Sequence, residues 1–479
     1  MKTGTRNILI MAGCIVVLGG TLAALLIPGN KKADPSSAVS TGSIELVSKK
    51  SDDVVSMAVS NQKGSYTLIP VTEAKTASAA SGTESSTTYE IKELKGIPLN
   101  GSAASQVVTN GYSLNAAKNL GAVSDLGEYG LKNPQAKVNV TFKDGSTYNY
   151  KIGNASATDS TNYYMCGENS DNVYIVNIDN GILESKNYFV NKTLFSITSA
   201  SGTNDFTQLH LSGKNFPSAI SIQMSSKENT ITSPIHAPAD SAAIEKVQTA
   251  LTSLTADSVE AVYPDAAALK SYGLDNPAAI AEFTVNKGSY KLLVGAFKDN
   301  LYYAMLDKVP VVYRLSVDSV SAWIQANAFA LRDKIVFMPL ITTVKSMTVT
   351  VDGKVSKLTL ERTKDEKKST ASNPVYSYKL TGTDGKTIDY ETNFKEFYKK
   401  VISIFLLEPT DQKPAGSPDV SVEYQYYDKS GKDTVSFYKS GDRRYIAAVN
   451  GSIYGMVTTD DVNTITDSLH LLENGKTVN

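Results

Sequence analysis

The chain has 479 residues, a length that predicts about three domains of ordinary size. Its 47 Lys and Arg residues balance 48 Asp and Glu residues, so no positive excess favours nucleic acid, and we expect no such partner. Cys166 is the only cysteine beyond the apolar N-terminal segment, which excludes a disulfide within the body.

The N-terminal segment from Ile8 to Ile27 contains 20 residues without a charge. At about 1.5 Å per residue, a helix of this length crosses a hydrocarbon core of roughly 30 Å. We predict a single transmembrane anchor at 8–27, after a short N-terminus at 1–7 and before a linker at 28–43. The alternatives are a cleaved secretory signal and a lipobox that would leave Cys14 acylated.

The charges that flank this segment do not fix its orientation. Lys2 and Arg6 precede it, and Lys31 and Lys32 follow it. The positive-inside rule compares such flanks, and here they are equal. The residues alone therefore leave open on which side of the membrane the body lies.

One motif of the body occurs twice. The stretch that begins at Leu126 returns at Leu269, which is 143 residues later (269 − 126). Repetition at this spacing predicts duplicated domains. The shared positions are Leu126, Tyr129, Gly130, Leu131, Asn133 and Pro134 in the first copy, and Leu269, Tyr272, Gly273, Leu274, Asn276 and Pro277 in the second.

The shared residues are typical of a helix end that leads into a strand. Gly130 and Gly273 are predicted to adopt the left-handed conformation after the helix, with the following leucine folded back on its last turn. The proline three residues after that leucine prevents the helix from resuming. We interpret the motif as structural.

The equivalence extends beyond this motif. Ile152-Gly153 matches Val294-Gly295, and Tyr163-Tyr164 matches Tyr302-Tyr303. A weaker third copy lacks the Tyr-Gly-Leu motif, but five positions recur 290 residues later (344 − 54): Val54, Ser56, Met57, Val59 and Leu68 as Val344, Ser346, Met347, Val349 and Leu358. We predict repeat units at 44–200, 201–338 and 339–479, the last one divergent.

Helices are predicted in the later units. Asp240 is a candidate cap for a helix whose apolar stripe is Ile244, Val247, Leu251 and Leu254. In the third unit, helical spacing joins Phe394, Phe397, Tyr398, Val401, Ile402 and Phe405. Residues 75–88, rich in Ala, Ser and Thr, are predicted to be a hairpin insertion. The predicted fold is α+β: tandem units of mostly antiparallel β-sheet with packed helices, preceded by one transmembrane helix.

No motif predicts chemistry. His210, His236 and His470 are too scattered for a local metal motif, and Asp307 is interpreted as a turn residue. Neither a phosphate-binding loop nor a nucleophile elbow is present. We expect no enzyme activity, no catalytic residue, no metal and no cofactor, although residues far apart in sequence can still meet in space.

The sequence resembles the bacterial family called domain of unknown function 4340. The resemblance rests on Tyr-Gly-Leu-x-Asn-Pro, the alternating strand after it, the strand end of the Ile152-Gly153 type and a Tyr-rich strand, and it covers roughly residues 44–340. It implies one N-terminal membrane helix with residues 1–7 in the cytoplasm, an extracytoplasmic body and association with ABC-type exporters, including gliding-motility-type systems. It implies no catalytic residue.

From this resemblance we expect a single-pass cell-membrane protein whose body is a non-enzymatic accessory of an ABC-type export system. Its expected partners are the cytoplasmic membrane, through residues 8–27, and the ABC permease and ATPase subunits. The alternative is a cell-surface adhesin or envelope-binding module with exposed Tyr-rich sheet faces. An envelope enzyme with a dispersed site is the third possibility.

Overall fold

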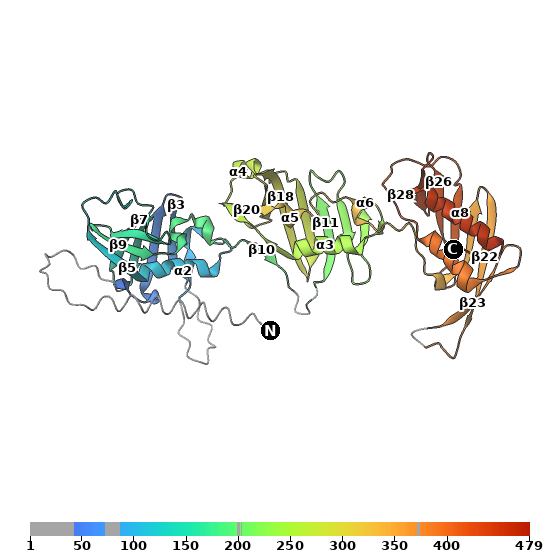
Figure 1. Ribbon diagram of the computed structural model, residues 1–479, viewed down its shortest axis with the longest axis horizontal. Helices are drawn as coiled ribbons and strands as arrows, with labels where there is room; N and C mark the ends of the chain where they lie inside the picture. Colours follow the sequence, from blue (N-terminus) through green and yellow to red (C-terminus); the bar gives the residue numbers. More distant parts are fainter. Residues whose placement is uncertain (1–42, 72–86, 199–201, 203, 371–373) are drawn as a thin grey trace, which may run out of the picture. The chain divides into compact units, whose positions relative to one another are not determined.

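The structure is a computed structural model that describes residues 43–71, 87–198, 202, 204–370 and 374–479 (Figure 1). The predicted anchor at 8–27 and most of the predicted hairpin insertion at 75–88 lie outside these residues. Among the helices of the described ranges, none combines the length and the apolar character that crossing a membrane requires. The described residues form three large antiparallel sheets and one small two-stranded sheet.

The chain divides into two compact units. The first comprises Met1–Lys95 and Asn100–Phe189 and contains the first large sheet. The second comprises Gly96–Leu99 and Val190–Asn479 and contains the other two.

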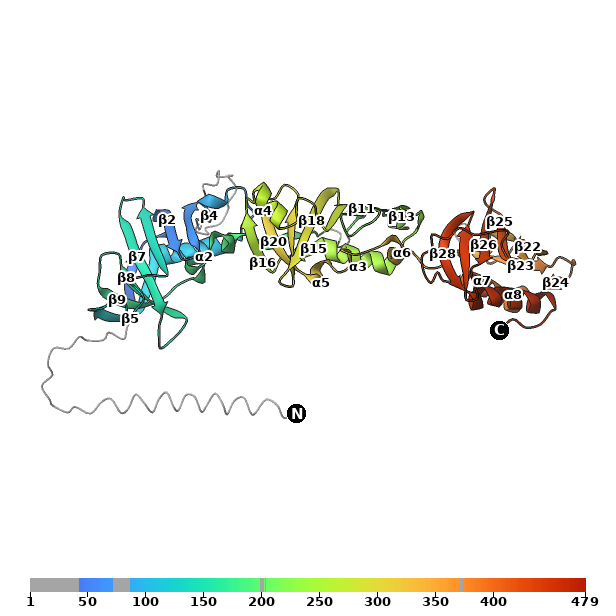
Figure 2. The same cartoon turned by 90° about the horizontal axis from the view of Figure 1, so that it is seen from above.

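The first sheet has nine strands in the order β1-β5-β9-β8-β7-β6-β2-β3-β4. Their bounds are β1 (Ile44–Ser48), β2 (Val54–Asn61), β3 (Gly64–Pro70), β4 (Tyr89–Ile91), β5 (Ser113–Ala122), β6 (Ala136–Phe142), β7 (Thr147–Ala155), β8 (Asn162–Gly167) and β9 (Asn172–Asn177). Helix α2 (Gly101–Tyr112) lies on one face of this sheet (Figure 2). Its buried side is made of small residues and valines, including Ala104 and Val107, which bring the helix close to the strands.

The second sheet also has nine strands, in the order β14-β13-β12-β11-β17-β18-β19-β20-β16. Their bounds are β11 (Phe206–Ser212), β12 (Ile220–Gln223), β13 (Thr230–Ser233), β14 (Ala237–Pro238), β16 (Ser258–Val262), β17 (Ala279–Val285), β18 (Gly288–Lys298), β19 (Leu301–Leu306) and β20 (Val311–Ser316). The small sheet pairs β10 (Thr193–Ser196) with β15 (Ser253–Thr255). The helices are α3 (Ser241–Thr252), α4 (Ala266–Ser271), α5 (Val317–Val320) and α6 (Ala328–Leu331).

Helix α3 begins as the sequence predicts, because the Asp240 side chain accepts a hydrogen bond from the Ala243 N–H at 2.7 Å. Ile244, Val247 and Leu251 are fully buried, which confirms three positions of the predicted stripe. Placing Leu254 on this helix was wrong. The helix ends at Thr252, and the chain continues as β15, where Leu254 pairs with Phe195.

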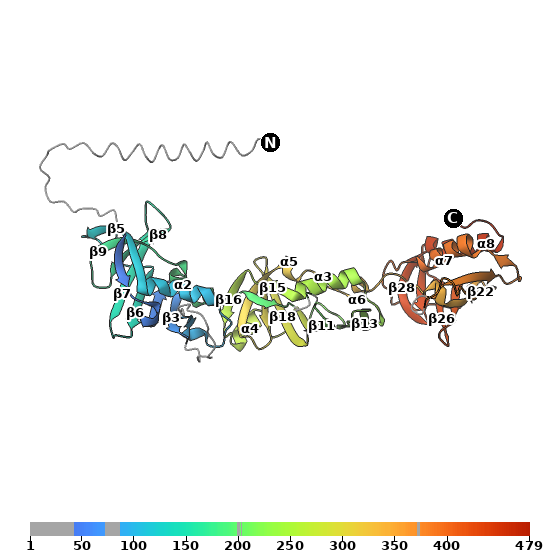
Figure 3. The same cartoon turned by 90° about the horizontal axis from the view of Figure 1, so that it is seen from below.

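The third sheet has eight strands in the order β24-β23-β22-β21-β25-β26-β27-β28. Their bounds are β21 (Val344–Val351), β22 (Lys354–Lys364), β23 (Tyr376–Thr381), β24 (Thr387–Ile388), β25 (Val420–Tyr426), β26 (Lys432–Lys439), β27 (Arg444–Val449) and β28 (Ser452–Thr458). Figure 3 shows α7 (Lys395–Ile402) and α8 (Thr459–Glu473) together on one face of it.

The predicted extension of the third-unit helix to Phe405 was wrong. A π-helical turn, Tyr390–Phe394, precedes α7, and the helix ends at Ile402. Phe405 instead forms an isolated antiparallel bridge with Ile335 and is 54% exposed. Backbone pairing with a segment far away in the sequence therefore prevails over the local helical pattern.

The three large sheets share one topology. The order β9-β8-β7-β6-β2-β3-β4 recurs as β20-β19-β18-β17-β11-β12-β13 and as β28-β27-β26-β25-β21-β22-β23. The register agrees as well, because Met57 faces Leu68 across β2 and β3, and Met347 faces Leu358 across β21 and β22. The internal repeat read from the sequence is thus a repeat of one fold.

Candidate functional site

The repeated Tyr-Gly-Leu motif forms a chain reversal that follows standard helix-ending geometry. Gly130 has φ +72° and Gly273 has φ +68°. The Leu131 N–H donates to the Leu126 carbonyl, and the Leu274 N–H donates to the Leu269 carbonyl, both at 2.9 Å. These are the six-residue bonds of a Schellman ending.

The two copies differ in what precedes this ending. In the second copy the ending terminates α4, which Asp265 caps. In the first copy residues 126–130 form turns only, so the expected helix there was wrong. The second copy has three alanines after its capping residue, whereas the first has Gly127, which is a poor helix former.

The motif docks on the sheet through a backbone hydrogen bond. The Tyr129 carbonyl accepts from the Asn154 N–H at 2.9 Å, and the Tyr272 carbonyl accepts from the Ala296 N–H at 2.8 Å. The residue before each donor is a glycine. A Cβ on Gly153 would lie 2.1 Å from the Tyr129 oxygen, and a Cβ on Gly295 would lie 2.2 Å from the Tyr272 oxygen. This contact explains why Ile152-Gly153 and Val294-Gly295 accompany the motif.

Side chains complete the docking. Tyr129 meets Tyr164 edge-on with ring centroids 4.9 Å apart, and Tyr272 meets Tyr303 at 4.6 Å. Leu131 is buried in a small cluster with Cys166 and Val173, and Leu274 is buried in the equivalent cluster with Tyr303 and Val312. Asn133 and Asn276 are exposed and stand directly before Pro134 and Pro277, which lead into β6 and β17.

Alanine at Gly130 is expected to destabilise the first sheet by about 2 kcal/mol, against about 1 kcal/mol for alanine at Gly273. Both positions have positive φ, but a Cβ on Gly130 would also lie 2.9 Å from the Asn154 N, whereas the closest atom to one on Gly273 is 3.1 Å away. Hydrogen exchange of β7 and β18 measures each effect. Gly145 has φ +82° and nothing within 4 Å of a Cβ, so alanine there isolates the conformational cost. If alanine lowers the stability of the sheet equally at Gly130 and at Gly145, crowding around a Gly130 side chain is contradicted.

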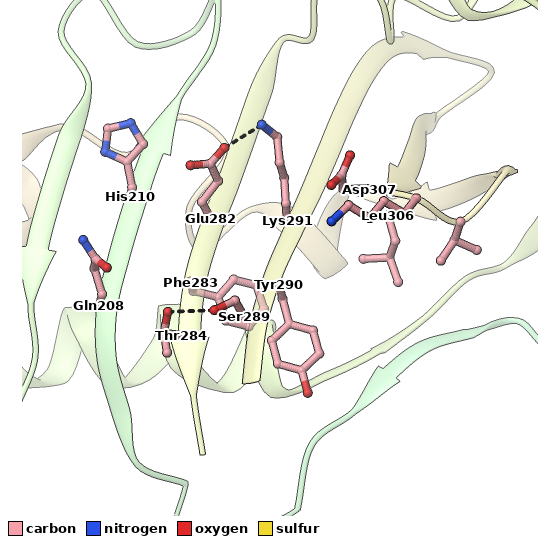
Figure 4. A pocket seen from close by; sticks show the side chains of 12 residues that line it. Gln208, His210, Glu282, Phe283, Thr284, Ser289, Tyr290, Lys291, Leu306 and Asp307 are labelled. Atoms are coloured by element: carbon pink, nitrogen blue, oxygen red, sulfur yellow. Dashed lines mark hydrogen bonds and ion pairs between the residues drawn. The ribbon is translucent and has the colours of Figure 1, made fainter. Parts of the chain in front are cut away.

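On each sheet, the docked motif packs on part of one face. On the second sheet, Leu293 and Met305 pack under the motif. Two residues away from these, Lys291 on β18 and Asp307, which directly follows β19, line a hollow of about 790 Å³ (Figure 4). This hollow is the candidate functional site.

Strand register brings the polar side chains of the hollow together. His210 on β11 faces Glu282 on β17, and Glu282 faces Lys291 on β18. The Lys291 Nζ lies 2.6 Å from the Glu282 Oε1 (Figure 4). The His210 Nδ1 lies 2.9 Å from the Ser221 Oγ. These residues share a face because buried residues such as Ala281 and Phe283 alternate with them.

The charged side chains of this row, Glu282 and Lys291, are paired with each other. The hydrogen bond that Lys291 donates to Glu282 raises the pKa of Lys291 above its usual range, and the nearby Asp307 carboxylate adds to the rise. Two carboxylates, Glu282 and Asp307, and two ammonium groups, Lys291 and Lys308, line the hollow. The charges of these four side chains cancel.

A second polar row lies two residues away along the strands. Gln208 on β11 faces Thr284 on β17, and Thr284 faces Ser289 on β18. The hydroxyl oxygens of Thr284 and Ser289 are 3.4 Å apart (Figure 4). The floor of the hollow therefore offers amide, hydroxyl, carboxylate and ammonium groups in two parallel lines.

This arrangement is suited to binding. Ser221, His210 and Glu282 lie on the neighbouring strands β12, β11 and β17, and this order resembles a hydrolytic triad. However, the Glu282 carboxylate is already bound by the Lys291 ammonium. Within the described part of the chain, no group of three or more His, Cys, Asp or Glu residues is placed to hold a metal ion. We interpret the two rows as hydrogen-bonding groups for a ligand.

Sequence reasoning missed this site. His210 was seen only as an isolated histidine, and Asp307 was interpreted as a turn residue. Asp307 does follow the end of β19, yet its N–H donates to the Lys291 carbonyl at 2.9 Å and thereby joins it to the row. The available signal was the alternation in β17, which marks Glu282 as facing away from the core.

The comparisons with known proteins concern the family alone. A family model described as Domain of unknown function (DUF4340) matches residues 90–230 and 230–417, more than half of the chain. The first match begins within β4 and the second begins with β13, which are equivalent strands of two sheets. Searches of curated proteins and of solved structures each give no match. The chain belongs to the DUF4340 family, as its repeated Tyr-Gly-Leu motif indicates.

Proposed function

We propose that this protein is a membrane-anchored, extracytoplasmic and non-enzymatic accessory of an ABC-type export system, which holds a ligand on the open polar face of its second sheet. The observation that carries the binding role is the hollow around the Glu282–Lys291 ion pair. A rigid sheet that presents paired charges, amides and hydroxyls is suited to hold a ligand by hydrogen bonds. The export role rests on the family resemblance.

Membrane anchoring is part of the same proposal. The segment Ile8–Ile27 supplies the length, and its Gly13, Gly19 and Gly20 allow another helix to pack closely. An accessory that contacts its permease through the anchor and also outside the membrane is held in place without a large interface on the body.

The experiment is crosslinking in the native host with a reagent that does not cross the membrane, followed by affinity purification of the full-length protein in mild detergent. An ABC permease is expected to be crosslinked, and its ATPase is expected to be recovered with it. Replacing residues 8–27 with an unrelated anchor is the control, and it should reduce the recovery. Absence of both transporter subunits, or absence of any crosslink to the body, contradicts the proposal.

The adhesin alternative predicts envelope polymers in place of transporter subunits in that experiment. It requires exposed Tyr-rich faces, and the tyrosines divide: Tyr66, Tyr150 and Tyr424 are buried core residues, whereas Tyr188 is 40% exposed and Tyr263 is 46% exposed. Such a role would also have the polar hollow at its disposal.

A further inference from the structure

The hollow on the second sheet is lined by two rows of side chains that donate and accept hydrogen bonds. His210, Glu282 and Lys291 form one line, and Gln208 and Thr284 begin the other. A ligand that satisfies such a floor must itself carry closely spaced groups that donate and accept. Hydroxyl groups do both.

The charge of the hollow favours a neutral ligand. Glu282 and Asp307 are offset by Lys291 and Lys308, and the ion pair Glu282–Lys291 stands in the centre of the row. An anionic ligand would have to approach two carboxylates, and a cationic ligand would have to approach two ammonium groups. A neutral polyhydroxyl ligand can accept from the ammonium groups and donate to the carboxylates at once.

The position on the sheet argues against an extended peptide. Peptides bind to sheets mainly by adding a strand at an edge, where backbone groups are unpaired. The hollow instead lies over β17 and β18, each of which is hydrogen-bonded to a strand on both sides. The backbone groups of these two strands are therefore paired, and Val309 adds apolar atoms to the lining, which suit the C–H face of a sugar ring.

We infer that this hollow binds a neutral oligosaccharide, whose hydroxyls donate to Glu282 and Asp307 and accept from Lys291 and Gln208. A volume of about 790 Å³ lies within the range of roughly 300–1,000 Å³ that is usual for ligand sites, and it gives room for a short oligosaccharide. The inference deepens the proposed function and rests on it only for the idea that the sheet face holds a ligand.

The test is calorimetric titration of the full-length protein, purified in an amine-oxide detergent that has no sugar head group. The probes are chitotetraose, cellotetraose and the blocked peptide acetyl-Ala-Lys-Glu-Ala-amide. At least one tetrasaccharide is expected to bind. Its affinity should change by less than about twofold between low and high salt, because the ligand is uncharged. Glu282→Gln should weaken binding roughly tenfold, because a charge-assisted acceptor is lost.

The matched control is Glu423→Gln. Glu423 makes the corresponding ion pair with Lys432 on β25 and β26 of the third sheet, so its loss should change sugar affinity by less than about twofold. Binding of the peptide alone, binding of no probe, or equal weakening by the two substitutions overturns the inference. These outcomes are independent of the exporter proposal, because no transporter subunit is present in the titration.

Discussion

Replacing Gly153 with valine is expected to lift the Tyr129-Gly130-Leu131 turn off the first sheet and to destabilise that sheet by about 3 kcal/mol or more. A Cβ at this position would lie 2.1 Å from the Tyr129 carbonyl oxygen and 3.0 Å from the Leu131 Cγ. The carbonyl cannot retreat without losing its hydrogen bond from the Asn154 N–H. The substitution therefore removes the backbone contact and the leucine packing together.

Cys166 reports this change directly. It is fully buried beneath the turn, in the same cluster as Leu131, and burial raises the pKa of its thiol. In a Cys14→Ser background it is the only thiol of the chain. Labelling with iodoacetamide under native conditions, followed by mass spectrometry, should be about 100-fold faster in the Gly153→Val variant, because a loss of about 3 kcal/mol raises the open population by that factor.

The control for this experiment is Gly101→Ala. Gly101 begins α2 on the same sheet, and no atom lies within 4 Å of a Cβ placed there. Alanine should leave the labelling of Cys166 unchanged or slow it slightly, since alanine favours the helix. Equal labelling of the Gly153→Val variant and the parent protein would show that the turn is not held by this contact.

The parts of the fold that follow from the sequence are those whose determinants are local. The Schellman bonds join Leu131 to Leu126, five residues apart, so Gly130 and the two leucines suffice to predict them. The cap at Asp240 is equally local. The repeat can be recognised in the sequence because the same turn motif occurs twice, beginning at Leu126 and at Leu269.

The parts that did not follow depend on register between distant strands. His210 and Lys291 contribute to one hollow only because β17 lies between β11 and β18 with Glu282 opposite both of them. No pattern within a single strand encodes that alignment. Phe405 was wrongly assigned to a helix for the same reason. Its spacing fits the helical pattern of the preceding residues, but its backbone pairs with Ile335, 70 residues earlier (405 − 335). The role of Gly153 is equally hidden in the sequence, because its close approach to the Tyr129 carbonyl oxygen arises only when the turn docks on β7.

The equivalent substitution in the second repeat, Gly295→Val, is expected to destabilise the second sheet by a similar amount and to leave the first sheet unaffected. A Cβ on Gly295 would lie 2.2 Å from the Tyr272 carbonyl oxygen, so the clash has the same origin as at Gly153. Trp323 is the single tryptophan of the chain and is fully buried, and it follows α5 in the second unit. Its fluorescence therefore reports unfolding there.

Urea unfolding followed through Trp323 should shift to lower urea by about 1–1.5 M in the Gly295→Val variant, for a loss of about 3 kcal/mol and an m-value of about 2–3 kcal/mol per molar. Labelling of Cys166 in that variant should keep the parental rate, because the thiol lies in the other compact unit. Gly153→Val should give the converse result, with fast labelling and an unshifted fluorescence transition. If either substitution moves both signals together, the repeats unfold as one cooperative body, and the independence inferred from their separate sheets and clusters is wrong.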